Sequence, residues 1–75
     1  MISLDKLKIN KKAKIITISD KSPIKRRLLD IGIIPGIMIE KILLSPFKGI
    51  SAYLVIDSII AIRDKDASFI EVCYE

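Results

Sequence analysis

The chain has 75 residues but no histidine, no tryptophan and a single cysteine, Cys73. Without histidine it cannot form a Ser-His-Asp or Cys-His catalytic arrangement, and one cysteine cannot form a disulfide within the chain. Its acidic residues are not spaced for a closed transition-metal site, and its glycines do not form a phosphate-binding loop. The sequence therefore predicts a protein that is not an enzyme, with no cofactor and no metal site.

Long apolar runs and aromatic residues are also scarce. No run approaches the roughly 20 apolar residues that cross a bilayer. The first residues already carry Asp5 and Lys6, so no secretory signal is visible. Aromatic residues make up only 5% of the chain, whereas proteins that bind single-stranded nucleic acid need aromatic rings for base stacking. These features predict a cytoplasmic protein without direct membrane insertion, and they disfavour nucleic acid as its partner.

Apolar residues and positive charge, by contrast, are abundant. Hydrophobic residues make up 51% of the chain and the net charge is +4. A domain of this size buries only about 60–65% of its unfolded surface, so we expect apolar side chains to remain exposed for a partner. The simpler alternative is that scattered exposed apolar residues are normal on any protein. The positive charge fits an acidic protein, nucleic acid or the inner membrane surface.

Residues 22–36 carry signals for both ends of a short helix. Ser22 is a good N-cap and Pro23 suits the first helical position, whereas Gly32 can take the positive φ that ends many helices. We expect this to be the only true helix. The apolar positions between the two ends recur at helical spacing and predict one stripe packed on a sheet: Ile24, Leu28 and Ile31.

The charges on this helix oppose its dipole. Lys25, Arg26 and Arg27 lie in the first half, where the dipole disfavours cations by roughly 0.3–1 kcal/mol each. The helix must therefore be stabilised by packing on the sheet. Two interpretations stay open: these residues form an ordinary solvated face, or together with Lys21 they form a basic patch for a partner.

β-branched residues predict five strands, at 13–18, 38–44, 52–56, 59–63 and 69–74. In the first strand the apolar phase changes, so a bulge near Ile15 and Ile16 would turn four apolar side chains inward: Ala13, Ile15, Ile16 and Ile18. Single helical turns are expected at 3–7 and 64–67. This pattern predicts a mostly β fold, a small five-stranded antiparallel barrel with one short helix after the first strand, in a single domain spanning residues 1–75.

Three connections matter for the fold, and two of them leave alternatives open. Asp57 and Ser58 form a plausible two-residue hairpin turn. Phe47, in the loop at 45–49, is either an exposed anchor or a cover over the barrel opening. Ile33 and Ile34 either pack inward or form an exposed hydrophobic knob.

The run from Arg27 to Gly36, RLLDIGIIPG, resembles the signature of the FeoA family of ferrous iron transport accessory proteins. Residues 13–15, 60–63, 67 and 70–72 support the resemblance, which extends over essentially the whole chain. The same SH3-like module also occurs as the C-terminal domain of metal-dependent repressors. One departure is Asn10, which stands where a glycine is common; asparagine tolerates the left-handed backbone conformation that such a glycine takes.

The resemblance implies an SH3-like barrel that docks on FeoB and modulates its assembly or activity. FeoB is the membrane transporter of Fe(II) and carries a cytosolic G domain, so the protein would lie at the inner face of the membrane through its partner. The resemblance does not imply that this chain binds iron. The contact region that it implies comprises the helix and the following turn: Lys25, Arg26, Arg27, Leu29, Ile33, Ile34, Pro35 and Gly36.

Two other functions stay open. A small SH3-like nucleic-acid-binding module would also be basic, and its binding would weaken steeply with salt because phosphate contacts release counterions. A self-associating module would bury its surplus isoleucines against a second copy.

Overall fold

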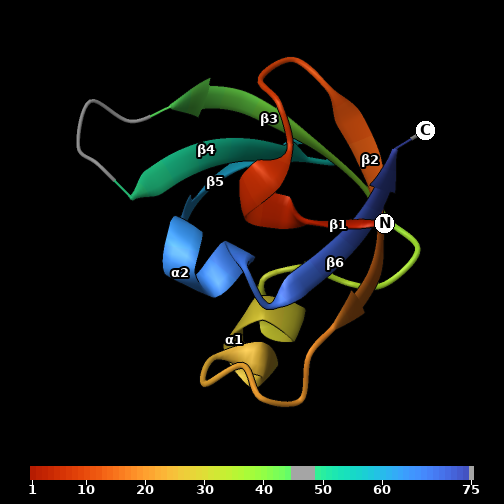
Figure 1. Ribbon diagram of the computed structural model, residues 1–75, viewed down its shortest axis with the longest axis vertical. Helices are drawn as coiled ribbons and strands as arrows, with labels where there is room; N and C mark the ends of the chain where they lie inside the picture. Colours follow the sequence, from red (N-terminus) through yellow and green to blue (C-terminus); the bar gives the residue numbers. More distant parts are fainter. Residues whose placement is uncertain (45–48, 75) are drawn as a thin grey trace.

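In the computed structural model, which describes residues 1–44 and 49–74, six antiparallel strands form one sheet in the order β1-β6-β2-β3-β4-β5 (Figure 1). The strand bounds are β1 (Ile2–Ser3), β2 (Lys12–Ile18), β3 (Met38–Leu44), β4 (Ile50–Val55), β5 (Ser58–Arg63) and β6 (Ile70–Tyr74). The helices are η1 (Leu4–Lys6), α1 (Lys25–Asp30) and α2 (Asp64–Ala67).

The mostly β architecture agrees with the prediction, and β3 has the predicted bounds. The strand count is six rather than five, because β1 has only two residues and is too short to show any periodicity. The expected helical turns near both ends are η1 and α2, so α1 is not the only helix. Phe47 and its predicted loop lie outside the described residues.

The predicted bulge in β2 is confirmed, but one of its consequences is not. The register against β6 shifts between Ile15 and Thr17, so Ile16 is the extra residue. Ala13, Ile15 and Ile18 are buried, whereas Ile16 is 37% exposed. Because a bulge inserts a single residue, it brings the two halves of the strand into one inward phase and leaves the inserted side chain outside.

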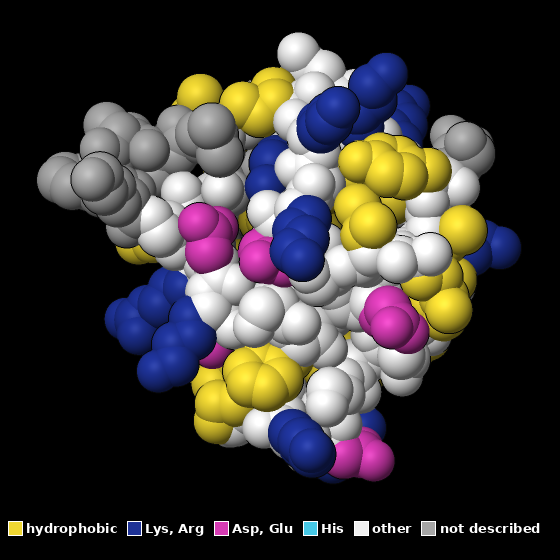
Figure 2. All heavy atoms as spheres, viewed as in Figure 1, with side chains coloured by type: hydrophobic (Ala, Val, Ile, Leu, Met, Phe, Trp, Pro, Cys, Tyr) yellow, Lys and Arg dark blue, Asp and Glu magenta, His cyan; other side chains and the backbone are white. Residues whose placement is uncertain are grey.

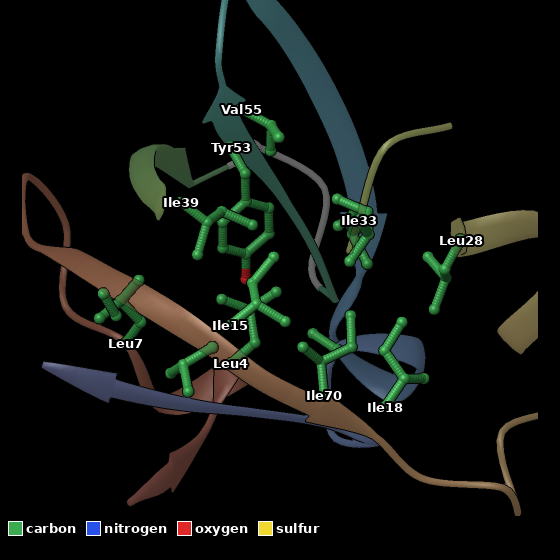
Figure 3. Close-up of a cluster of buried hydrophobic side chains, with 14 residues drawn as sticks. Leu4, Leu7, Ile15, Ile18, Leu28, Ile33, Ile39, Tyr53, Val55 and Ile70 are labelled. Carbon is green, nitrogen blue, oxygen red and sulfur yellow. The ribbon is translucent and has the colours of Figure 1, made fainter. Parts of the chain in front are cut away.

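The core lies inside the curved sheet, and the short helices contribute to it (Figure 3). Leu4 and Leu7 cover one side of it, and both are almost completely buried. Tyr53 lies at its centre with no exposed surface, and its hydroxyl points toward Leu4 and Ile15 (Figure 3). Among the described residues this hydroxyl has no hydrogen-bond partner.

Lys41 is a charged residue inside this core, with only 4% of its surface exposed. Its Nζ donates a hydrogen bond to the backbone carbonyl of Asp5 at 3.0 Å and lies 5.7 Å from the centre of the Tyr53 ring. Lys41 thereby connects β3 to η1. Sequence periodicity could not show this burial, because a lysine in an apolar strand ordinarily faces solvent.

The β4–β5 turn lies one residue earlier than predicted. Val55 pairs with Ser58, so the two turn residues are Ile56 and Asp57. Ile56 has a φ of 57° and is 69% exposed. A β-branched residue in the left-handed region is strained, and nothing in the local sequence marks Ile56 as a turn residue.

Replacing Ile56 by asparagine should therefore stabilise the fold. Asparagine tolerates this conformation, so we expect the Ile56→Asn variant to gain about 1 kcal/mol in the free energy of unfolding. Urea denaturation measures this difference. Ile59→Asn is the matched control, because Ile59 is also 69% exposed but lies in a strand, where asparagine is unfavourable. An equal gain in both variants would show that the effect comes from lower surface hydrophobicity rather than from relief of strain.

Candidate partner-docking surface

Helix α1 begins later than the sequence suggests. Its N-cap is Ile24, and among the described residues no side chain caps it. Ser22, the predicted cap, is buried and accepts a hydrogen bond from the Ile24 N–H at 3.3 Å. Ser22 therefore organises the turn that leads into the helix, and Pro23 belongs to that turn.

The end of α1 is a Schellman motif, which settles where the next two isoleucines lie. Gly32 has a φ of 101°, its N–H donates to the Leu29 carbonyl, and the Ile33 N–H donates to the Leu28 carbonyl. In this motif the residue after the glycine packs back on the last turn, and Ile33 is accordingly fully buried. Ile33 is thus a core residue and cannot be part of a contact region; Ile34 is 44% exposed and can.

The predicted apolar stripe of α1 is only partly correct. Leu28 is the only buried residue of the helix, whereas Ile24 is half-buried against the core. Ile31 is 46% exposed, because the helix ends at Asp30 and the chain turns at Ile31 with φ −91° and ψ 4°. Ile31 is therefore an exposed apolar residue beside the arginines. The sequence pattern did not predict the exposure of Ile31, because the helical periodicity was extended one residue beyond the end of the helix.

The cations of α1 differ in their availability. Lys25 is half-buried and forms an ion pair with Asp20, and this hydrogen bond and charge lower the pKa of the Asp20 carboxyl. Arg26 lies 3.6 Å from Asp30, but both side chains are largely exposed, and exposed pairs of this kind contribute little. Arg27 has no ion pair within the described part of the chain. The two arginines are therefore accessible to a partner.

We call the exposed and half-exposed residues of α1 and its following turn the α1 surface: Lys25, Arg26, Arg27, Leu29, Asp30, Ile31, Gly32, Ile34, Pro35 and Gly36. A groove of about 590 Å³ runs beside it, between α1, β5 and α2. Arg27 and Ile31 line this groove from the helix. The opposite wall comes from residues that are far away in the sequence: Ile60, Ala61, Ile62, Arg63, Lys65 and Asp66.

The apolar surplus expected from composition does reach the surface. The exposed isoleucines are Ile9, Ile16, Ile31, Ile34, Ile56 and Ile59. Only Ile31 and Ile34 belong to the α1 surface. The others lie elsewhere, and Ile59 is on β5, which pairs with β4 alone among the described strands. Self-association through these side chains stays a prediction.

Among the described residues no three potential ligand side chains gather closely enough to hold a metal ion. In the same residues, no helix has both the length and the apolar composition of a membrane-spanning segment. The site is thus an arrangement of cationic and apolar side chains beside a groove.

The sequence matches the FeoA domain over residues 2–73. The chain belongs to the FeoA family. FeoA proteins are non-enzymatic accessory proteins of ferrous iron transport, as the resemblance of residues 27–36 implied. No curated protein matches the chain significantly.

Solved structures show the same fold. The FeoA-like protein of Clostridium acetobutylicum is 28% identical, with a TM-score of 0.84, and the match covers 99% of this chain and 88% of that one. The FeoA of Stenotrophomonas maltophilia, an SH3 domain protein solved with zinc, is 21% identical with a TM-score of 0.82 and coverages of 96% and 89%. The FeoA fold here is thus SH3-like, as predicted.

The fold also occurs within larger proteins. The IdeR protein of T. acidophilum is 25% identical with a TM-score of 0.84. The match covers 99% of this chain but only 34% of IdeR. This agrees with the expected relation to the C-terminal domain of metal-dependent repressors.

Proposed function

We propose that this FeoA protein docks on the cytosolic part of a FeoB-type transporter through the α1 surface and modulates the assembly or activity of the transporter. The observation that carries the proposal is the combination of two accessible arginines and two exposed isoleucines on one short segment, of which Arg27 and Ile31 line the groove. Arginine and large apolar side chains are the residues that dominate protein–protein contact energies. By this proposal the protein lies at the cytoplasmic face of the membrane through its partner.

The groove supports the same proposal. Its apolar floor comes from Ile24, Leu28 and Ile62. Three cations and one carboxylate lie along its walls: Arg27, Arg63, Lys65 and Asp66. An acidic segment with apolar anchors would match both properties, because charge complementarity orients an encounter and apolar burial holds the complex. A purely solvated helix face would need no such apolar groove.

Reversing both arginine charges tests the proposal. We expect the Arg26→Glu/Arg27→Glu variant to bind the FeoB cytosolic domain at least about tenfold more weakly, mainly through slower association. Titration calorimetry at several salt concentrations measures the loss, which should shrink as salt screens the charges.

The matched control is Lys8→Glu/Lys11→Glu, which changes the net charge equally at exposed positions in the turn at the end of the molecule opposite α1 (Figure 1). It should bind FeoB with unchanged affinity, and urea denaturation should show that both variants are folded. Undiminished binding of the arginine variant would remove the α1 surface as the contact region. Equal losses of binding affinity in both variants would show that the effect comes from net charge alone.

A further inference from the structure

A second cationic surface lies at the end of the molecule opposite α1 (Figure 1). It is the turn between η1 and β2 together with the start of β2, and its lysines are all exposed: Lys8, Lys11, Lys12 and Lys14. Figure 2 shows Lys and Arg side chains gathered at this end, next to apolar side chains. Three of the lysines line a shallow hollow of about 540 Å³ with Asn10 and Tyr74. We call these four lysines and Ile9 the lysine turn.

Backbone hydrogen bonds hold the lysine turn in place. Asn10 takes the left-handed conformation at φ 66°, and its N–H donates to the Lys41 carbonyl at 2.7 Å. The Lys41 N–H donates in return to the Lys11 carbonyl at 3.3 Å, and the Lys11 N–H donates to the Lys8 carbonyl. Because Lys41 itself is anchored in the core, the backbone that carries the lysines is fixed before any ligand arrives.

Within the part of the chain that the structure describes, the positive charge of the lysine turn is largely uncompensated. The ion pairs found within residues 1–44 and 49–74 involve Lys25 and Arg26, not these lysines. Among residues 1–44 and 49–74, one carboxylate stands next to these lysines: Glu40 lies opposite Lys12 in the β2–β3 register. The cluster therefore keeps an excess of positive charge, which attracts an anionic surface.

Ile9 indicates whether the lysine turn suits a lipid bilayer or a nucleic acid. It lies in the sequence Lys8-Ile9-Asn10-Lys11 and is 39% exposed at the turn. An apolar residue flanked by lysines suits the boundary of a bilayer, where cations meet headgroup phosphates and the apolar side chain reaches the acyl region. A nucleic acid would instead favour stacking rings, and Tyr74 is the only aromatic residue among those lining the hollow.

We propose that the lysine turn binds the anionic headgroups of a lipid bilayer surface, with the Ile9 side chain at the boundary between headgroups and acyl chains and no part of the chain crossing the membrane. This surface contact is separate from the proposed docking on FeoB and does not depend on it. Contact with lipid through the lysine turn leaves α1, at the far end of the molecule, free (Figure 1).

Vesicle cosedimentation tests this proposal. The full chain should bind vesicles of equal parts phosphatidylcholine and phosphatidylglycerol, should not bind phosphatidylcholine alone, and should dissociate as salt rises. In the Lys8→Glu/Lys11→Glu variant the partition coefficient should fall by at least about tenfold, since each lysine near the surface contributes about one factor of five. The charge-neutral variant Lys8→Gln/Lys11→Gln should fall between this variant and the unmodified protein.

Two further variants make the result specific. Arg26→Glu/Arg27→Glu carries the same change in net charge and should bind these vesicles at least about tenfold more strongly than the lysine variant. Ile9→Ser should bind severalfold more weakly than the unmodified protein with the same dependence on salt. The proposal is overturned by equal losses in the lysine and arginine variants, by equal binding to phosphatidylcholine alone, or by no binding at low salt. Displacement of the vesicles by a short RNA at lower concentration than phosphatidylglycerol would assign the surface to nucleic acid instead.

Discussion

Replacing Leu28 by alanine is expected to lower the free energy of unfolding by about 2–5 kcal/mol. Leu28 is the only buried residue of α1, and Figure 3 shows it directed toward the side of the core formed by Ile18 and Ile33. The helix has little other support. It has six residues, cations in its first half and no side-chain cap within the described residues. A helix of this length does not persist alone in water.

Urea denaturation of Leu28→Ala measures the loss, with Leu29→Ala as the matched control on the same helix. Leu29 is half-buried and only borders the core, so its truncation should cost less than half as much. Because the Leu28 side chain belongs to the same buried cluster as Ile33, the loss should extend to the turn that follows α1. Similar losses in both variants would mean that α1 does not depend on a single anchor.

Stability is expected to fall as the pH rises from about 10 to about 12, through Tyr53. Burial raises the pKa of this tyrosine to about 12, and the carboxylates of Asp64 and Asp5 act in the same direction. In the unfolded chain the phenol loses its proton near pH 10, whereas in the folded protein it keeps the proton until about pH 12. Between these values the folded state binds more protons, so the free energy of unfolding decreases with pH, by up to about 3 kcal/mol.

The Tyr53→Phe variant isolates this effect. It should lack the Tyr53 part of the alkaline decline, and below pH 10 it should be no less stable than the unmodified protein, because the buried hydroxyl has no partner among the described residues. Tyr74→Phe is the control, since Tyr74 is 45% exposed. Urea denaturation across this pH range measures the difference. If Tyr53→Phe and the unmodified protein decline equally, the buried phenol is not the group responsible.

The strands could be predicted where local composition and tertiary packing agree. β3 has the predicted bounds because its β-branched and apolar residues favour a strand on both faces. The bulge in β2 could be predicted because the apolar phase changes at Ile15 and Ile16. β1 could not, since two residues gain their strand geometry only by pairing with β6.

Other features depend on contacts that the sequence does not show. Ile56 takes the turn position because the register of β4 and β5 places it there, against its own preference. Lys41 is buried because a carbonyl of η1 and the ring of Tyr53 are near its ammonium group. In both cases the tertiary structure overrides the local preference.

The candidate site could be predicted in part. The positions of Arg26 and Arg27 follow from the helix signals and the family signature, and the structure places both at the surface. The choice between Ile33 and Ile34 required the Schellman geometry at Gly32. The groove could not be predicted, because β5 and α2 lie more than a helix length away in the sequence and meet α1 only in the folded chain.

The α1 surface and the lysine turn lie at opposite ends of the longest dimension of the molecule, which is 29 Å (Figure 1). Substitutions at such a separation ordinarily act additively, so the free-energy changes of the arginine and lysine variants should sum when they are combined. By the two proposals, the transporter bound at the α1 surface and the membrane bound at the lysine turn would not compete for the protein. A rigid domain between the two would also hold them at a fixed distance from each other, so the chain has the geometry of a spacer.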